Sequence, residues 1–237
     1  MSADDGSRTS REQRLVEAAL AHTGLLRGAA PAQLAALARQ CATMRAKRGE
    51  MIVARGARPR GLYAVGEGTV KLSLRHGDGE ERVLRLAQRG DTFGSATALL
   101  GRAARYEAHA LTDCVLVVVP PAALFALIEN DARAARRIVE ILAERNLEML
   151  GELEASTLLS GAQRLAAYLE SLARRAPRAG PWTVRLPATK TVIASHLDMK
   201  KETFSRLLRA LAEQGLIGVT QRDITLLDRE KLAELAR

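Results

Sequence analysis

TKTVIASHLDMKKETFSRLLRALAEQGLI, residues 189–217, contains two apolar patterns of helical period separated by a few residues. In the first pattern, Ile193 and Leu197 fall on one side of a short helix. The second has the i, i+3, i+4, i+7 spacing of an amphipathic helix, at Phe204, Leu207, Leu208 and Leu211. LIGV and ITLL follow, separated by TQRD, in the manner of a two-stranded wing. The stretch therefore predicts a winged helix-turn-helix, in which the second helix reads the major groove of DNA.

The exposed face of this second helix combines positive charge with one carboxylate. Its polar members are Lys200, Lys201, Glu202, Ser205, Arg206 and Arg209. Phosphates would repel Glu202, but base edges have a use for it, because glutamate accepts a hydrogen bond from the amino group of cytosine. Arginine in turn binds guanine with two hydrogen bonds. We therefore predict that Glu202 and Arg206 select a base sequence, whereas contacts to phosphates position a helix without specifying a sequence. The other predicted DNA-binding residues are Lys200, Lys201, Ser205 and Arg209.

An ordinary helix surface accounts for part of the same pattern. Glutamate is favoured in the first turn of a helix by the dipole, and a glutamate four residues before an arginine is a common surface pair. The distribution of charge favours DNA. From residue 156 onward there are 14 basic and 8 acidic residues, a net charge of +6, whereas the preceding 155 residues carry +3. Positive charge is thus concentrated in the part that contains the helix-turn-helix.

The overall composition is that of a soluble protein with an anionic partner. The 237 residues carry a net charge of +9, and the pI is near 10.2. Cys41 and Cys114 lack CxxC spacing, which argues against a disulfide framework and against a structural zinc site. The polar N-terminus lacks the apolar core of a signal peptide, and no apolar run reaches the roughly 18–20 residues that span a bilayer. We expect a cytoplasmic protein that binds double-stranded DNA and no membrane.

The chain divides by pattern into four segments. Residues 1–14 predict a flexible tail. Residues 15–130 predict a sensor domain of β structure with flanking helices, one of them over PAQLAALARQ. Residues 131–156 predict a long helix. Residues 157–237 predict the winged helix-turn-helix domain, whose first helix begins at the capping-box pattern Ser160-Gly-Ala-Gln163.

The β segment is recognised by its glycines and by alternation. Short runs between glycines place apolar residues on one side, as with Val70, Leu72 and Leu74, and polar residues on the other. Many short strands joined by glycine turns indicate a β-sandwich or barrel. The fold class predicted for the whole chain is therefore α+β.

The long helix carries two neighbouring apolar stripes. One consists of Ile138, Leu142, Met149 and Leu153, and the second of Val139, Ala143, Leu147 and Leu150. A helix that packs on a single domain usually needs one stripe. We therefore predict a homodimer, with Ile138, Leu142, Met149 and Leu153 as its contact; a broad face buried within one domain is the alternative.

The order of these segments resembles the CRP/FNR superfamily of bacterial transcription regulators. The resemblance covers residues 25–235 and rests on RGEMIVARG, GLYAVGEGTVKL, GDTFG, the long helix, and KKETFSRLLRALAEQGLI followed by DITLLD. It implies an N-terminal β-roll like a cyclic-nucleotide-binding jelly roll, a dimerisation helix and a C-terminal winged helix. It also implies dimers that bind palindromic promoter sites and contact RNA polymerase.

The reading helix resembles the FNR type within this family. Glu202, Ser205 and Arg206 match the motif E-x-x-S-R residue by residue. The resemblance implies a TTGAT-like half-site, with Arg206 on the guanine and Glu202 on the opposing cytosine.

The effector region departs from the cyclic-nucleotide pattern of the family. That pattern has a glutamate after Phe-Gly for the ribose and an Arg-Ser pair for the cyclic phosphate. Here Ser95 follows Gly94, and Arg105 is followed by Tyr106. These four residues are the predicted effector pocket, and the missing acceptor predicts against strong cAMP binding. The alternative for Arg105 is an ordinary surface position.

Two branches of the family are associated with other cofactors, an iron–sulfur cluster and haem. Two cysteines cannot supply the four ligands of an iron–sulfur cluster, so none is expected. WTVRLPATKTVIASHLDMKKETFSR and RYEAHAL resemble the Dnr-type branch, which is associated with nitric oxide and denitrification. That branch implies haem b, bound without a CxxCH attachment motif, and His196 and His109 are the candidate ligands. For both histidines an ordinary polar position is the alternative, and the effector stays open.

Other classes of function have less support in the sequence. It lacks GxSxG, a P-loop, HExxH and any paired acid–base signature, so no enzyme is predicted. A regulator that responds to a cyclic nucleotide or another small molecule without haem is the main alternative. A ligand-binding module without DNA function conflicts with the basic helix-turn-helix.

Overall fold

The computed structural model describes residues 3–24, 30–75, 77, 80–175 and 182–236. The chain forms two compact units. The first comprises residues 1–80 and 84–146, and the second comprises residues 81–83 and 147–237. Among the described residues, no helix is both long enough and apolar enough to cross a membrane.

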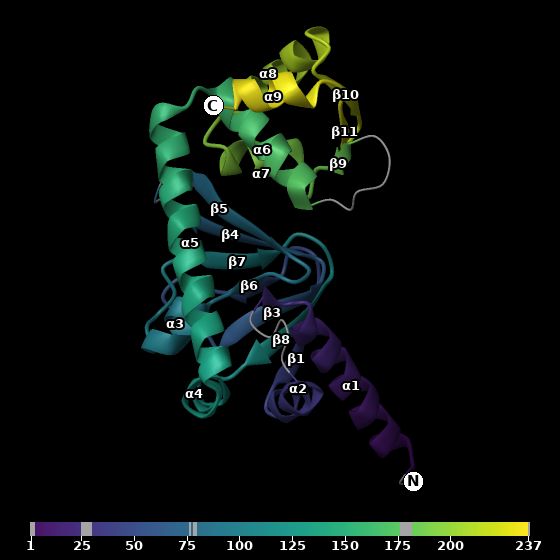
Figure 1. Cartoon of the computed structure of the whole chain (residues 1–237), viewed down its shortest axis with the longest axis vertical. Helices are drawn as coiled ribbons and strands as arrows, with labels where there is room; N and C mark the ends of the chain where they lie inside the picture. The colour runs from purple at the N-terminus through teal and green to yellow at the C-terminus, as the bar shows by residue number, and fades with distance from the viewer. Residues whose placement is uncertain (1–2, 25–29, 76, 78–79, 176–181, 237) are drawn as a thin grey trace. The chain divides into compact units, whose positions relative to one another are not determined.

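Within the described residues, eight strands and five helices build the first unit and the long helix that leaves it (Figure 1). The strands are β1 (Ala42–Ala46), β2 (Met51–Val53), β3 (Leu62–Glu67), β4 (Thr69–Arg75), β5 (Glu81–Gln88), β6 (Thr92–Phe93), β7 (Glu107–Ala110) and β8 (Cys114–Val119). The helices are α1 (Ala3–Ala21), α2 (Pro31–Ala38), α3 (Ser95–Leu100), α4 (Pro121–Asn130) and α5 (Ala132–Leu158).

The strands form two four-stranded sheets, in the orders β1-β8-β3-β6 and β2-β7-β4-β5. Neighbouring strands such as β3 and β8 are antiparallel, with Leu62 opposite Val119 and Tyr63 opposite Val118. This is the predicted β-roll. The α+β class is confirmed.

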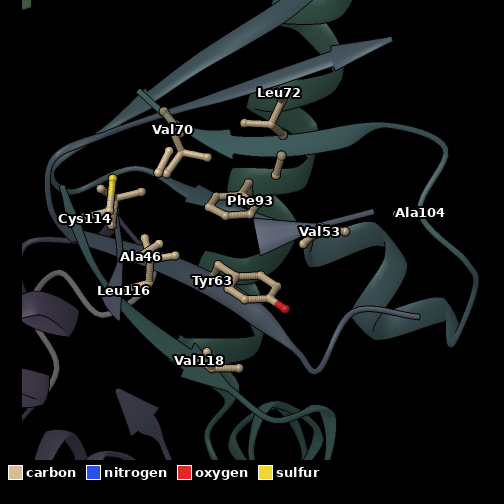
Figure 2. Close-up of a cluster of buried hydrophobic side chains, with 14 residues drawn as sticks. Ala46, Val53, Tyr63, Val70, Leu72, Phe93, Ala104, Cys114, Leu116 and Val118 are labelled. Carbon is tan, nitrogen blue, oxygen red and sulfur yellow. The ribbon is translucent and has the colours of Figure 1, made fainter. Parts of the chain in front are cut away.

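β3 separates two apolar clusters because its side chains alternate. Tyr63 and Val65 point into the space between the two sheets, where the Tyr63 and Phe93 rings stack with centroids 4.9 Å apart (Figure 2). Leu62 and Ala64 point the other way, toward a cluster that includes residues of α1, α2, α4 and α5. The first sheet is thus covered on both faces, which explains why β3 and β8 are almost continuously buried.

The predicted flexible tail over residues 1–14 is corrected by α1, which includes Ala3 to Arg14 in a single helix that continues to Ala21. The physical reason lies at its C-terminal end. Val16, Ala19 and Leu20 are buried in the cluster beneath the first sheet. This apolar anchor holds the last turns, and helix propagation from an existing turn costs little.

α5 divides its apolar residues between two environments. Ile138 is buried in the core of the first unit, and Ile141 and Leu142 pack against that core. Farther along the helix, Met149 and Leu153 are exposed, as are Val139, Leu147 and Leu150. The stripe predicted for dimerisation is therefore split: Ile138 and Leu142 serve their own domain, and the exposed residues form a different face.

Beyond α5, the described residues of the second unit form four helices and three strands. They are α6 (Gly161–Arg175), β9 (Thr183–Arg185), α7 (Lys190–His196), α8 (Lys201–Glu213), β10 (Ile217–Thr220), β11 (Asp223–Leu226) and α9 (Arg229–Leu235). The predicted capping box is confirmed at the start of α6, where the Ser160 amide donates to Gln163 Oε1 at 3.0 Å and the Gln163 amide donates to Ser160 Oγ at 3.3 Å. The predicted wing is larger than two strands, because β9 pairs with β11 in the order β10-β11-β9.

Candidate nucleic-acid interface and effector region

α8 has one buried and one exposed face, as its sequence period predicts. Phe204, Leu208 and Leu211 are buried within the second unit. On the other side, Lys201, Glu202, Arg206 and Arg209 are exposed, with Lys200 at the N-cap and Ser205 half-buried. All six predicted DNA-reading residues thus lie on or beside the face of α8 that its own core leaves open.

The turn before α8 holds the helix in place by local backbone geometry. α7 begins at the N-cap Thr189, whose side chain accepts a hydrogen bond from the Val192 amide at 3.4 Å. After α7 the chain reverses through Asp198, which has a φ of +55°, in the left-handed region. The Met199 amide donates to the Ala194 carbonyl at 3.0 Å and closes the turn. Such a tight turn between two packed helices is the helix-turn-helix arrangement.

The charged groups of this face are available to a ligand. Within the described part of the chain, neither the Glu202 nor the Arg206 side chain makes a hydrogen bond or an ion pair. Glu202 lies in the first turn of α8, where the helix dipole favours a carboxylate. The i, i+4 surface pair that Glu202 and Arg206 could form is therefore absent among the described residues, and both side chains are exposed.

The four predicted effector residues do not share one pocket. Gly94, with a φ of +82°, and Tyr106 meet inside the roll: a Cβ added to Gly94 would lie 3.6 Å from the Tyr106 hydroxyl. Burial raises the pKa of the Tyr106 phenol. Arg105 is exposed. Ser95 instead lines a small apolar pocket on the opposite side of β3, toward α5.

This apolar pocket is lined by Leu62, Thr92, Ser95, Leu99, Leu124, Ile138, Ile141 and Leu142. All of these residues belong to the first unit. The hydroxyls of Thr92 and Ser95 are the only polar side-chain groups among these eight lining residues. None of the eight side chains is a customary ligand of haem iron.

The two histidines predicted as haem ligands lie in different units. His109, in β7, is opposite Lys71 of β4 and Met51 of β2. Its Nδ1 atom is buried without a hydrogen-bond partner among the described residues. His196 ends α7 and packs edge-on against the ring of Tyr168 of α6, with centroids 5.7 Å apart. The described residues contain no cluster of three or more His, Cys, Asp or Glu that could hold a metal ion.

Sequence reasoning missed two charged side chains that hold the second unit together. Arg164 of α6 donates hydrogen bonds to the backbone carbonyls of Leu159, Leu197 and Asp198. Glu170 of α6 is buried and accepts hydrogen bonds from Arg229 of α9. A signal for Glu170 was present: it falls between Ala166 and Ala173 on the buried stripe of an amphipathic helix, where a charge needs a partner.

Two family models match the two units. A cyclic nucleotide-binding domain matches residues 43–131, and a Crp-like helix-turn-helix domain matches residues 163–235. The nitrogen fixation regulation protein FixK of Azorhizobium caulinodans is 31 % identical over 184 residues, which are 73 % of this chain and 71 % of that protein. A CRP-like cAMP-activated global transcriptional regulator of Mycobacterium tuberculosis is 27 % identical over 220 residues, 92 % of this chain and 98 % of the relative.

Solved structures show the same architecture. A CRP family transcriptional regulator from Thermus thermophilus has a TM-score of 0.65 and 30 % identity, covering 81 % of this chain and 96 % of that one. FixK2 from Bradyrhizobium japonicum has a TM-score of 0.76 and covers 83 % of this chain and 98 % of that one; at 24 % identity it supports the fold. Together with the roll, the long helix and the winged helix described above, these matches show that the chain belongs to the CRP/FNR family of transcription regulators.

Proposed function

We propose that the protein is a homodimeric regulator that reads a TTGAT-like palindrome with Glu202, Ser205 and Arg206 of α8. The observation that carries the proposal is the open face of α8, where a carboxylate without an intramolecular partner among the described residues stands beside exposed cations. Arg206 binds the guanine of each half-site and Glu202 accepts from the opposing cytosine. Lys200, Lys201 and Arg209 contact phosphates, and the bound dimer contacts RNA polymerase.

The homodimer forms through the exposed face of α5. Val139, Leu147 and Leu150 are 64 %, 68 % and 54 % exposed, although they are large and apolar. Exposed apolar rows on a helix are typical of a surface that another chain covers. A second copy is the occupant we propose, because a palindrome requires two recognition helices related by a two-fold axis.

DNA reading is tested by fluorescence anisotropy with a labelled TTGAT palindrome and with a duplex whose guanine–cytosine pair is replaced in both half-sites. The unaltered protein should bind the palindrome more tightly by about 1–3 kcal/mol per half-site. Glu202→Ala should bring the two affinities together, because the group that distinguishes cytosine is gone. Equal affinity of the unaltered protein for both duplexes would overturn the proposal.

Lys201→Ala is the matched control for base reading. A phosphate contact carries no sequence information, so this variant should weaken both duplexes by the same factor. It should also make the slope of log affinity against log salt shallower by about 1 for each copy of the chain. If Lys201→Ala also lost the preference for the TTGAT palindrome over the altered duplex, the assignment of base recognition to Glu202 rather than Lys201 would be wrong.

The first unit is the sensor in this proposal, and it binds a small effector other than cAMP. The family model of a cyclic nucleotide-binding domain matches its residues 43–131, and the Mycobacterium tuberculosis relative is named as cAMP-activated. In this chain, however, the Tyr106 ring occupies the space beside Gly94 inside the roll. Arg105 is exposed and Ser95 lies on the other side of β3. Such a divided set cannot close around one sugar and one phosphate without rearrangement.

Haem is the second candidate effector, and one observation favours it: the buried Nδ1 of His109 has no hydrogen-bond partner among the described residues. The residues present do not fit a haem. The apolar pocket of the first unit does not include His109 in its lining, and none of its lining side chains is a customary iron ligand. No step of the proposed function therefore passes through haem.

An absorbance titration of the protein with ferrous haem and then NO tests this reading, with His109→Ala and His196→Ala alongside. We expect weak, superstoichiometric binding that neither substitution alters. A stoichiometric Soret band that shifts with NO and changes shape in one variant would instead identify a haem site and its ligand.

A further inference from the structure

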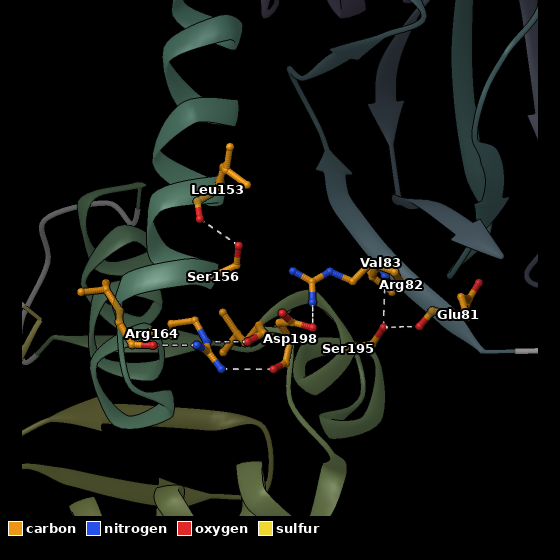
Figure 3. A network of polar contacts seen from close by, with 10 residues as sticks. Glu81, Arg82, Val83, Leu153, Ser156, Arg164, Ser195 and Asp198 are labelled. Atoms are coloured by element: carbon orange, nitrogen blue, oxygen red, sulfur yellow. Dashed lines mark hydrogen bonds and ion pairs between the residues drawn. The ribbon is translucent and has the colours of Figure 1, made fainter. Parts of the chain in front are cut away.

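Arg164, in the first turn of α6, donates to three backbone carbonyls in two segments of the second unit (Figure 3). Its Nη1 donates to the Leu159 carbonyl at 2.7 Å, immediately after the end of α5. Its Nε donates to the Leu197 carbonyl at 2.9 Å, and its Nη2 donates to the Asp198 carbonyl at 3.1 Å. One guanidinium therefore bridges the end of α5 and the turn that precedes α8.

These carbonyls need a donor from outside their own helices. Leu197 is the C-cap of α7, and the last carbonyls of a helix have no intrahelical partner. Leu159 follows the last residue of α5 and is in the same position there. Arginine presents five N–H donors in a rigid planar fork, so it can satisfy several acceptors at fixed angles, which a lysine cannot.

A second observation places the start of α6 directly against α8. A Cβ added to Gly161 would lie 3.2 Å from Leu207 Cδ1 of α8 and 3.7 Å from Met199 Cε in the turn. The junction therefore has little free space in which α8 could shift. Close packing and the three hydrogen bonds act on the same contact, between the end of α5 and the recognition helix.

We propose that Arg164 is a positioning residue for DNA reading. It fixes the orientation of α8 relative to the end of α5, and in a dimer joined through α5 it thereby sets the distance between the two recognition helices. The inference rests on the proposed function, because that distance matters only if both copies read one palindrome. Half-sites of such palindromes are about 34–36 Å apart, so a small change in the angle of α8 changes which spacing fits.

The first test compares Arg164→Met with the unaltered protein on three palindromes, whose half-sites are at the native spacing, one base pair closer and one base pair farther apart. The preference of the unaltered protein for one spacing should fall at least about threefold in Arg164→Met. The slope of log affinity against log salt should stay the same, because Arg164 contacts no phosphate.

Two outcomes of this test would overturn the inference. If Arg164 only stabilises the fold, its loss lowers affinity for all three palindromes by one common factor. If it contacts DNA, the salt dependence becomes shallower. Arg174→Met is the matched control, since Arg174 is an exposed arginine near the other end of α6, and this variant should keep the spacing preference.

A second measurement needs no DNA. Amide hydrogen exchange at Leu159, Asp198 and Met199 should become at least about tenfold faster in Arg164→Met, with amides of α9 unchanged. Arg174→Met should not change it. Failure of the unaltered protein to bind any palindrome would refute the proposed function, while exchange would still report on Arg164. Unchanged exchange at the junction would show that Arg164 does not hold it.

Discussion

Two glutamates of the second unit differ in burial and in role: Glu202 is proposed to contact DNA, and Glu170 pairs with Arg229 inside the unit. Glu202 is exposed on α8, whereas only 6 % of the Glu170 side chain is accessible. The Arg229 Nε donates to Glu170 Oε1 at 3.1 Å, and Nη2 donates to Oε2 at 3.0 Å. The Arg229 guanidinium also lies 4.1 Å from the centroid of the Trp182 ring. This group joins α6 to α9 and to the segment before β9.

Glu170→Gln should lower the free energy of unfolding of the second unit by about 2 kcal/mol, because the half-buried Arg229 then loses the buried carboxylate that accepts its hydrogen bonds. Urea unfolding followed by tryptophan fluorescence measures this. Trp182 is the single tryptophan of the chain and lies within the affected group, so the signal reports on this unit.

Glu213→Gln makes the same chemical change at an exposed position of α8. It should alter the free energy of unfolding by less than about 0.5 kcal/mol. If both variants unfold at the same urea concentration, the Glu170–Arg229 pair contributes no net stability.

The sequence predicts the position of some of these residues and not of others. The open face of α8 follows from helical periodicity, since Phe204, Leu208 and Leu211 fix which side is buried. Arg164 and Tyr106 could not be assigned in this way. Arg164 binds carbonyls 33 and 34 residues away in the chain, and the direction of Tyr106 depends on how β7 enters the roll. Both depend on tertiary contacts that a local pattern does not contain.

Among the secondary-structure elements, α5 shows why a stripe does not reveal its partner. Ile138 and Met149 share a stripe, yet Ile138 is buried and Met149 is 54 % exposed. The helical period is the same for both residues, but the core of the first unit extends only as far as Leu142 along the helix. Sequence predicts that a face is apolar, while the length of the neighbouring core decides which part of the face remains open.

The first helix and the wing illustrate the same point. The residues before Leu15 are polar, so their pattern predicts a tail, but α1 extends through them from an anchor at Val16, Ala19 and Leu20. β9 has only three residues, and its pairing with β11 turns a two-stranded wing into a three-stranded sheet. In α1 the local signal is outweighed by helix propagation from a buried anchor, and in the wing by pairing with a strand that is distant in the sequence.

The assembly of two chains depends on the exposed face of α5, and Leu150→Asp tests it. A carboxylate in the centre of an apolar contact is costly to desolvate, so this variant should be a monomer at concentrations at which the unaltered protein is a dimer. Sedimentation equilibrium measures the mass directly. Glu148→Gln is the matched control: it also changes the charge by one, at an exposed residue that lies two positions and about 200° around the helix from Leu150.

The two variants should also differ in DNA binding. If Lys200, Lys201 and Arg209 each neutralise one phosphate per copy, a dimer gives a slope of log affinity against log salt of about −5. A monomer engages one half-site and should give about half that slope, together with a much lower affinity for the palindrome. Glu148→Gln should keep the steeper slope. A monomeric Leu150→Asp that retained full affinity and slope would show that one copy suffices, and the palindrome would lose its role in recognition.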